Sequence, residues 1–219
     1  MLIHWIWLAT RAGMGDHGRR MLLDRFQDPE TIYYAGPGAF DEMENLSAQA
    51  KTSLSDKELT ECDQILSRCA EGRINILTYK DAAYPARLKN IPDPPMVLYY
   101  KGTLPDVDSQ PVVGVVGTRY ASAYGLQTAK RMGYQIAACG GMLVSGMAEG
   151  IDAMAMKGAL TAGTPVIGVL GCGADVVYPL CNRALFLDTE RYGCILTECP
   201  PGTPPLGKHF PGATGSSAA

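Results

Sequence analysis

The stretch Val112-Val113-Gly114-Val115-Val116-Gly117-Thr118-Arg119 decides the fold predicted for this chain. Its valines leave no polar face for water, which is typical of a strand buried on both sides of a parallel sheet. The run ends in a glycine turn, and a helical pattern begins near Ser122. A strand that passes through such a turn into a helix leaves backbone N–H groups unpaired, and these groups bind anions, phosphate above all. Arg119 adds a planar cation that matches phosphate geometry.

The same unit of strand, turn and helix recurs along the chain. Further strands are predicted at residues 142–146, 165–170 and 194–198, with helices at 149–162 and 182–192. This alternation predicts an α/β protein with an extended Rossmann-like parallel sheet and helices on both faces. Two short strands, at residues 74–79 and 97–102, fit at the edge of that sheet. Each main strand ends in small residues at the carboxyl edge, where open α/β sheets bind ligands.

Residues 1–71 are predicted to be a small helical domain, with an apolar helix at the start. Gly13-Met14-Gly15 followed by Arg19 and Arg20 resembles a helix-hairpin-helix or SAM-like DNA-binding module. A helical bundle in which the glycines cap a helix explains the same residues. Ser55-Asp56-Lys57-Glu58 has the form of a capping box and predicts a helix from Ser55 to about Glu71. The predicted domains are therefore 1–71, an α/β domain at 72–211, and a tail at 212–219.

Composition and charge limit the function classes. The net charge is −3, but ten acidic residues against three basic ones gather in residues 28–71, which leaves the α/β part able to bind an anion. The seven cysteines form no C-x-x-C pair, and neither an export signal nor a membrane-spanning run is found. We therefore expect a cytoplasmic protein with reduced thiols, no metal or other cofactor and no membrane partner.

Six motifs occur in order from residue 78 onward. They are Thr78-Tyr79-x-Asp81-x-x-Tyr84-Pro85, Asp93-Pro94-Pro95, Val116-Gly117-Thr118-Arg119, Ser145-Gly146-Met147-Ala148-x-Gly150-Ile151-Asp152-Ala153, Gly171-Cys172-Gly173-x-Asp175-x-x-Tyr178-Pro179, and Glu198-x-Pro200-Pro201-Gly202-Thr203-Pro204-Pro205. Together they resemble the DNA-processing protein A (DprA/Smf) family. The resemblance implies an extended Rossmann fold and a homodimer that binds single-stranded DNA. It also implies a recombination mediator that protects incoming DNA and loads the RecA recombinase during natural transformation, with no catalytic activity and no cofactor.

The predicted DNA-binding residues lie at the strand ends and on the helices that follow them: Gly117, Arg119, Ser145, Gly146, Lys157, Asn182 and Arg183. Arg119 is expected to contact a phosphate, with the Ser145 hydroxyl and the Gly146 amide as neutral donors beside it. A turn that only lets the helix pack explains Ser145-Gly146 equally well. A solvated helix face also explains Lys157 and Arg183. Asp152 is expected to cap a helix or fix a turn, because a carboxylate repels phosphate.

An enzyme is the alternative function. Phosphoribohydrolases of the lysine-decarboxylase-like type share a related core and bind a nucleoside monophosphate at the same edge. They need a Pro-Gly-Gly-x-Gly-Thr-x-x-Glu loop, which this chain does not contain. Nor do its histidines, at positions 4, 17 and 209, suggest a catalytic set.

The end of the chain departs from the family pattern. After Phe210-Pro211 the family continues x-Arg-Asn-Arg into a basic helix and a strand, whereas this chain ends in Gly212-Ala213-Thr214-Gly215-Ser216-Ser217-Ala218-Ala219. One coding sequence for these residues, shifted by two bases, reads Arg-Asn-Arg-Ile-Ile-Ser-Gly. We therefore expect the tail to be the product of a frameshift that truncates the α/β domain and exposes apolar sheet surface.

Overall fold

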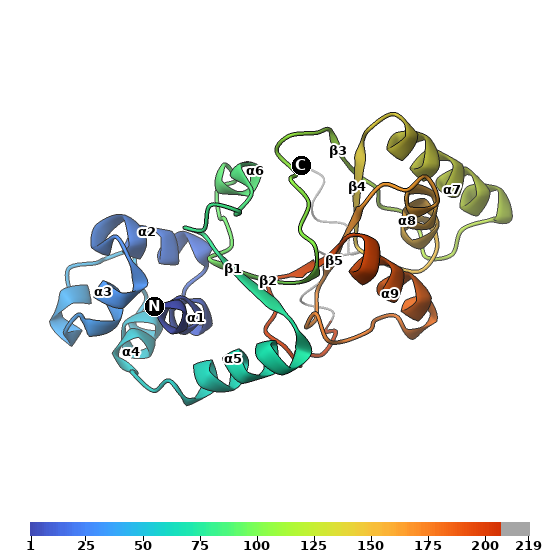
Figure 1. Cartoon of the computed structure of the whole chain (residues 1–219). Helices are drawn as coiled ribbons and strands as arrows, with labels where there is room; N and C mark the ends of the chain where they lie inside the picture. Colours follow the sequence, from blue (N-terminus) through green and yellow to red (C-terminus); the bar gives the residue numbers. More distant parts are fainter. Residues whose placement is uncertain (207–219) are drawn as a thin grey trace. The chain divides into compact units, whose positions relative to one another are not determined.

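The computed structural model describes residues 1–206 (Figure 1). Two compact units are present: a helical unit of residues 1–71 and 76–98, and an α/β unit of residues 72–75 and the chain from Tyr99 onward. The predicted boundaries at 71/72 and 211/212 stay a prediction, as does the frameshift in residues 212–219, which lie outside the described residues. No helix within residues 1–206 is both long and apolar enough to span a bilayer.

The helical unit contains short helices and, in residues 76–98, parts of the first two strands. Their bounds are α1 Leu2–Thr10, α2 Asp16–Phe26, α3 Pro29–Tyr34, the 3-10 helix η1 Pro37–Phe40, α4 Ala48–Ser55, α5 Thr60–Gly72 and α6 Ala86–Lys89. The core forms around α1, because Ile6, Trp7 and Leu8 are fully buried against Leu22 and Ile32 of the next two helices. Each large apolar side chain removed from water contributes about 1.5–3 kcal/mol.

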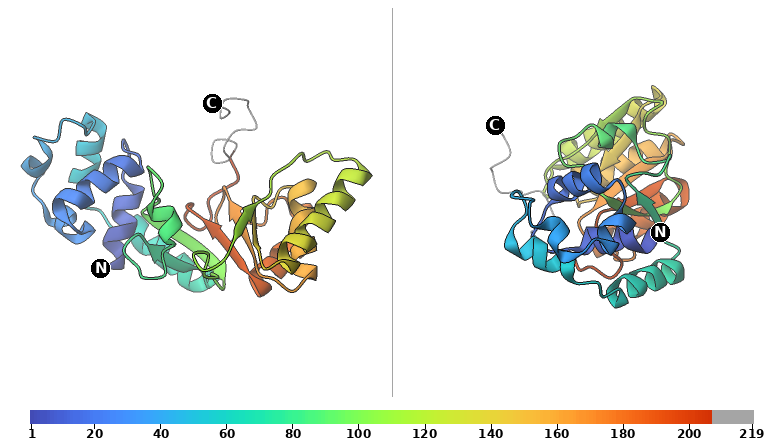
Figure 2. Two further views of the ribbon diagram at one scale, coloured as in Figure 1. Left: turned by 90° about the horizontal axis from the view of Figure 1, so that it is seen from above. Right: turned by 90° about the vertical axis from the view of Figure 1, so that its left-hand side faces the viewer.

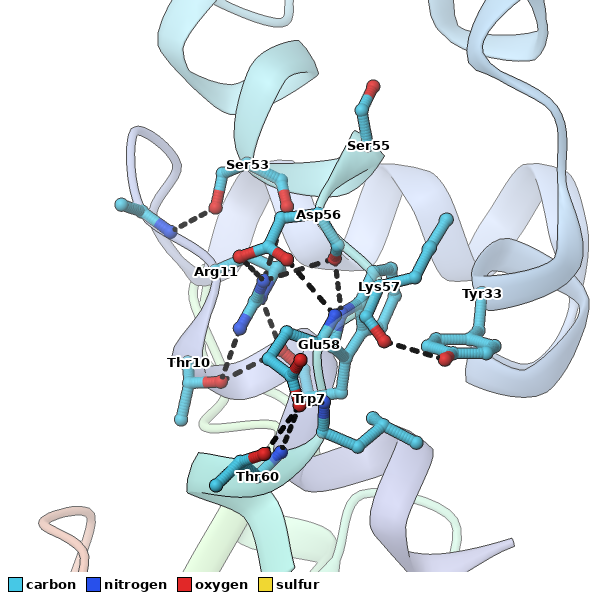
Figure 3. Close-up of polar contacts among 12 residues, drawn as sticks. Trp7, Thr10, Arg11, Tyr33, Ser53, Ser55, Asp56, Lys57, Glu58 and Thr60 are labelled. Atoms are coloured by element: carbon cyan, nitrogen blue, oxygen red, sulfur yellow. Dashed lines mark hydrogen bonds and ion pairs between the residues drawn. The ribbon is translucent and has the colours of Figure 1, made fainter.

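Arg11 joins α1 to the chain that follows α4 (Figure 3). The buried guanidinium donates to the Trp7 carbonyl at 3.0 Å and to the carbonyls of Ser53 and Asp56 at 3.3 and 3.2 Å. The Trp7 indole N–H donates to the same Asp56 carbonyl at 2.9 Å. Since a buried cation needs such acceptors, the network fixes the backbone at Asp56 in an extended conformation.

That extended residue explains why the predicted capping box at Ser55 is wrong. Ser55 is the last residue of α4, and its hydroxyl donates to the Lys51 carbonyl at 3.0 Å. The next helix begins only at Thr60, where the Glu58 carboxylate accepts from the backbone N–H of Thr60 at 3.0 Å (Figure 3). The local pattern predicted the start of the helix five residues too early, because Arg11 and Trp7 hold the intervening backbone out of the helix.

The Gly13–Gly15 connection packs inside the bundle. Gly13 has φ +80°, and a Cβ there would lie 2.7 Å from the backbone nitrogen of Ala50. Ser47, the N-cap of α4, donates its hydroxyl to the Gly13 carbonyl at 2.9 Å. Arg19 donates to the carbonyls of Leu8 and Arg11 at 3.0 Å each. These contacts favour the interpretation of this segment as a capped helical bundle, because Arg19 and the loop carbonyl are already engaged.

The α/β prediction is confirmed: residues 1–206 form a six-stranded mixed sheet with helices on both sides, and helices precede it. The strand order is β1-β2-β6-β5-β4-β3. The strands are β1 Asn75–Thr78, β2 Val97–Gly102, β3 Val112–Gly114, β4 Met142–Ser145, β5 Val166–Leu170 and β6 Cys194–Thr197. Strands β3 to β6 are parallel, and β2 joins them antiparallel to β6, with Tyr99 opposite Thr197.

The crossovers between the parallel strands are helical. They are α7 Ala123–Ala138, α8 Ile151–Thr161, and the 3-10 turn η2 Leu180–Asn182 that leads into α9 Arg183–Tyr192. These helices pack against β4, β5 and β6, with α8 in contact with both α7 and α9 (Figure 2). Successive right-handed crossovers in one direction place these helices side by side. Because each helix begins after the end of a parallel strand, the helix N-termini lie at the carboxyl edge of the strands.

The prediction that the valine-rich strand is buried on both faces is wrong. It is the last strand in the order among residues 1–206 and pairs only with β4. Val113 is 37 % exposed and Val116, beyond the end of β3, is 82 % exposed. Composition predicted a strand correctly, but lateral position in the sheet depends on pairing with distant segments. Val169 of β5, 42 % exposed, is also open to solvent.

Helices α7 and α8 approach each other through two glycines. A Cβ on Gly133 would lie 2.0 Å from the Ala155 carbonyl oxygen, and a Cβ on Gly158 would lie 2.0 Å from the Lys130 carbonyl oxygen. Both distances are far inside van der Waals contact, so only glycine permits this helix pair. The close approach fixes the relative position of the two helix N-termini.

Candidate functional site

A cavity of about 660 Å³ opens at the carboxyl edge of the parallel strands. It lies where the turn after β3, residues 119–122, meets the turn after β4, residues 149–150, with Asn182 of η2 on its border. The side chains of α8 at Met154 and Lys157 complete the wall. We call this the turn cavity.

Two helices direct their N-termini at the turn cavity. Ser122 is the N-cap of α7, and its hydroxyl oxygen accepts from the Gly125 N–H at 3.2 Å. Gly150 is the N-cap of α8 at φ +88°, and a Cβ there would lie 2.3 Å from the Thr118 carbonyl oxygen. The Ile151 N–H donates to that same carbonyl at 3.3 Å and ties the two turns together. Each helix N-terminus carries roughly half a positive charge, so the cavity attracts anions.

Side-chain charges reinforce this field, with one exception. Arg119 and Lys157 are exposed on the cavity wall, and within residues 1–206 neither side chain has a hydrogen-bond or ion-pair partner. Glu149 lies on the same wall and is exposed as well. The cavity therefore holds two cations and two helix N-termini against one carboxylate, a combination that suits phosphate groups.

Two predicted donors are used inside the protein. The Gly117 N–H donates to the buried Asp152 carboxylate at 2.9 Å, and the Ser145 hydroxyl donates to the Val115 carbonyl at 2.7 Å. The Gly117 amide and the Ser145 hydroxyl proton are thus engaged within the protein, which favours the turn-forming interpretation, and the prediction that these residues bind DNA stays a prediction. Asp152 fixes the turn, in accord with the role expected for it.

The other predicted residues divide between the cavity and its surroundings. Asn182 is buried, borders the cavity and donates its amide to the Met147 carbonyl at 2.9 Å. Met147 has φ +57° and inserts above Gly168, where any Cβ would lie 2.2 Å from the Met147 sulfur. Asn182 therefore holds the loop after β4 in place. Gly146 and Arg183 are exposed but do not line the cavity, so their role stays a prediction.

Sequence reasoning missed part of the wall. Glu149 and Cys181 also line the cavity. Glu149 directly precedes the α8 N-cap, so its position at a strand-end turn was the available signal. Cys181 gave none, because η2 is brought to the cavity only by the crossover from β5.

Two buried thiols of the α/β unit are kept neutral. Burial raises the pKa of Cys172 to about 11 and that of Cys194 to about 12. Both stay protonated at neutral pH and are therefore poor nucleophiles. Among the described residues, no group of three or more His, Cys, Asp or Glu side chains is placed to hold a metal ion.

A Rossmann-like sheet with helix N-termini and cations at its carboxyl edge defines a class of protein that binds phosphate-bearing ligands. Residues 75–212 match the DNA recombination-mediator protein A family, and the chain belongs to this family. The resemblance expected from the motifs is thereby confirmed.

Relatives in several bacteria show similar sequences and structures. The chain is 34 % identical to Protein Smf of Synechocystis sp. over 212 residues, covering 95 % of this chain and 53 % of that protein. It is 36 % identical to DNA processing protein DprA of Bacillus subtilis over 148 residues, 68 % of this chain and 50 % of that one. The chain thus spans about half the length of these relatives.

Two solved structures resemble the fold. The X-ray structure of DNA processing protein A from Streptococcus pneumoniae has a TM-score of 0.79 at 27 % identity, covering 96 % of this chain and 72 % of that chain. A structure of DNA processing protein A from Helicobacter pylori, described for its single-stranded DNA binding mode, has a TM-score of 0.54 at 27 % identity, covering 64 % of this chain and 62 % of that chain.

Proposed function

We propose that the α/β unit binds single-stranded DNA at the turn cavity and takes part in DNA processing during transformation. The observation that carries this proposal is the convergence of the α7 and α8 N-termini with Arg119 and Lys157 on one cavity. The similarity to DNA processing proteins of Bacillus subtilis and Streptococcus pneumoniae supports the role. The similar structure of the Helicobacter pylori protein, described for its single-stranded DNA binding mode, supports the ligand.

The shape of the site favours a single strand over a duplex. The donors are helix N-termini and two side chains around a concave cavity, rather than the side of a helix that could enter a groove. A single strand bends its phosphates into such a cavity, whereas duplex phosphates follow a fixed curve. The exposed Tyr120 ring beside Arg119 supplies a platform on which a base can stack.

Fluorescence anisotropy with matched single- and double-stranded oligonucleotides tests the proposal. The parent protein is expected to bind the single strand more tightly and to lose affinity as salt rises. Arg119→Gln and Lys157→Gln should each weaken single-strand binding about tenfold, since a charge-assisted phosphate contact is worth roughly 1.5–3 kcal/mol.

Arg73→Gln is the matched control, because Arg73 is an exposed cation next to β1, at the opposite end of the strand order from β3. It removes the same charge and should leave affinity almost unchanged. Equal affinity for single and double strands, or equal losses for all three variants, would contradict a specific site in the turn cavity.

The wider role proposed for the protein is that of a recombination mediator. In this role a homodimer protects incoming single strands and loads the RecA recombinase onto them. Assembly of RecA on single-stranded DNA coated with a single-strand binding protein should speed up when the chain is added. Native mass spectrometry measures the oligomer. A monomer, or RecA assembly no faster than without the chain, would limit the role to DNA binding.

A further inference from the structure

A second cavity, of about 450 Å³, lies between the outer faces of α7 and α8. Its walls carry Tyr124, Lys130, Arg131 and Tyr134 from α7 and Thr161 from α8, and Gly158 forms part of its lining. We call this the helix groove. It exists because Gly158 has no side chain and lies against the backbone of Lys130.

The helix groove continues the turn cavity along the same two helices. Leu126 of α7 and Met154 of α8 line the turn cavity, and the residues four positions later, Lys130 and Gly158, line the groove. Residues four apart lie on one face of a helix, one turn further along. The two cavities therefore follow each other in the direction of the helix C-termini.

The lining of the groove has the chemistry of a nucleic-acid track. Lys130 and Arg131 are exposed, and within the described part of the chain neither side chain has a hydrogen-bond or ion-pair partner. No carboxylate lines the groove. Tyr124 is 76 % exposed and Tyr134 is 48 % exposed, so two rings lie open beside the two cations. Cations beside exposed rings bind phosphates and stack bases.

We propose that the helix groove is a second subsite for single-stranded DNA, which takes the nucleotides adjacent to those in the turn cavity. This proposal rests on the function proposed above. Lys130 and Arg131 contact phosphates there, and Tyr124 and Tyr134 stack on bases. A DNA oligonucleotide that is too short to extend beyond the turn cavity does not contact the helix groove.

The test compares two lengths of oligothymidylate, about 4 and about 16 nucleotides, the range that single-strand-binding modules cover. The paired variant Lys130→Gln/Arg131→Gln should lose about tenfold or more in affinity for the long strand and should bind the short strand like the parent. Its salt slope with the long strand should fall by about 1.4, or about 0.7 for each lost phosphate contact. Tyr124→Ala should cost about fivefold or more with the long strand alone.

The control and the remaining outcomes separate this proposal from the first one. Arg73→Gln should leave both lengths unaffected, and circular dichroism should show that every variant is folded, since the replaced side chains are exposed. The proposed subsite in the helix groove is overturned if the parent binds both lengths with equal affinity, or if the paired variant loses affinity equally for both. Neither result contradicts DNA binding at the turn cavity. The proposed subsite is also overturned if the paired variant changes the oligomeric state and leaves the DNA affinity unchanged. That result would assign the helix groove to contact between copies of the chain. If the parent binds neither length, both proposals fail.

Discussion

The replacement of Gly158 by Ala tests the helix packing on which both cavities depend. The added Cβ would lie 2.0 Å from the Lys130 carbonyl oxygen and 2.9 Å from the Tyr134 backbone nitrogen. Ordinary contact begins near 3.4 Å, so α7 and α8 must move apart by about 1.4 Å, and neither neighbour is a side chain that can rotate away. Overpacking of this kind costs about 1–3 kcal/mol. The gain in helix propensity offsets about 0.5–1 kcal/mol of that.

We therefore expect Gly158→Ala to lower the free energy of unfolding by about 1–2 kcal/mol. Urea denaturation followed by circular dichroism measures the loss, and hydrogen exchange of the α7 and α8 amides locates it. Gly125→Ala is the control, because it lies in α7 with its nearest neighbour, the Ser122 hydroxyl, at an ordinary 3.5 Å. It should be neutral or stabilising.

The double variant Gly133→Ala/Gly158→Ala sharpens the test. Both added methyl groups are accommodated by the same separation of α7 and α8, so the combined loss should be smaller than the sum of the single losses. If Gly158→Ala is as stable as Gly125→Ala with unchanged amide exchange, the close packing inferred between these helices is refuted.

Three further results are expected. Glu149→Gln should tighten single-strand binding about two- to fivefold, because it removes the carboxylate from the turn cavity; unchanged affinity in an anisotropy titration would place Glu149 away from the DNA. Alkylation of Cys181, which lines that cavity, should slow when single-stranded DNA is present, whereas exposed Cys139 at the end of α7 should react at the same rate; equal rates at Cys181 with and without DNA would count against the site. Burial lowers the pKa of His4, so the unfolded chain takes up this proton more readily than the folded one. Stability is then full above the ordinary histidine pKa of about 6.5 and falls on acidification below it, a fall that thermal melts should show to be smaller for His4→Asn.

Some parts of the fold followed directly from local sequence. The apolar runs at β4, β5 and β6 and the helices between them lie where periodicity placed them, because alternation of buried and exposed positions is a property of the neighbouring residues. Ser122 was predicted at the start of a helix and is its N-cap. The prediction of a capping box at Ser55 was wrong. The carbonyl of the next residue, Asp56, accepts a hydrogen bond from Arg11, which lies more than forty residues earlier in the chain.

The candidate site divides in the same way. Arg119, Lys157 and Asn182 were predicted, and the structure gathers them on one cavity. Gly117 and Ser145 were predicted as ligand donors on the same grounds, yet their partners are protein groups. A glycine or serine at a strand end has a donor by virtue of its type, but the type does not say whether that donor is already used.

The sequence by itself determined the α/β class, the family and the turn at which we propose that an anion binds, because these depend on residue types at fixed local spacing. The tertiary structure alone decided that β3 lies at the end of the strand order and that Asp152 and Val115 occupy the expected donors. It also decided that Glu149 faces the same cavity as Arg119. The physical reason is that strand pairing and these hydrogen bonds join segments that are 30 or more residues apart in the sequence. Which of these segments come into contact depends on how the whole unit packs.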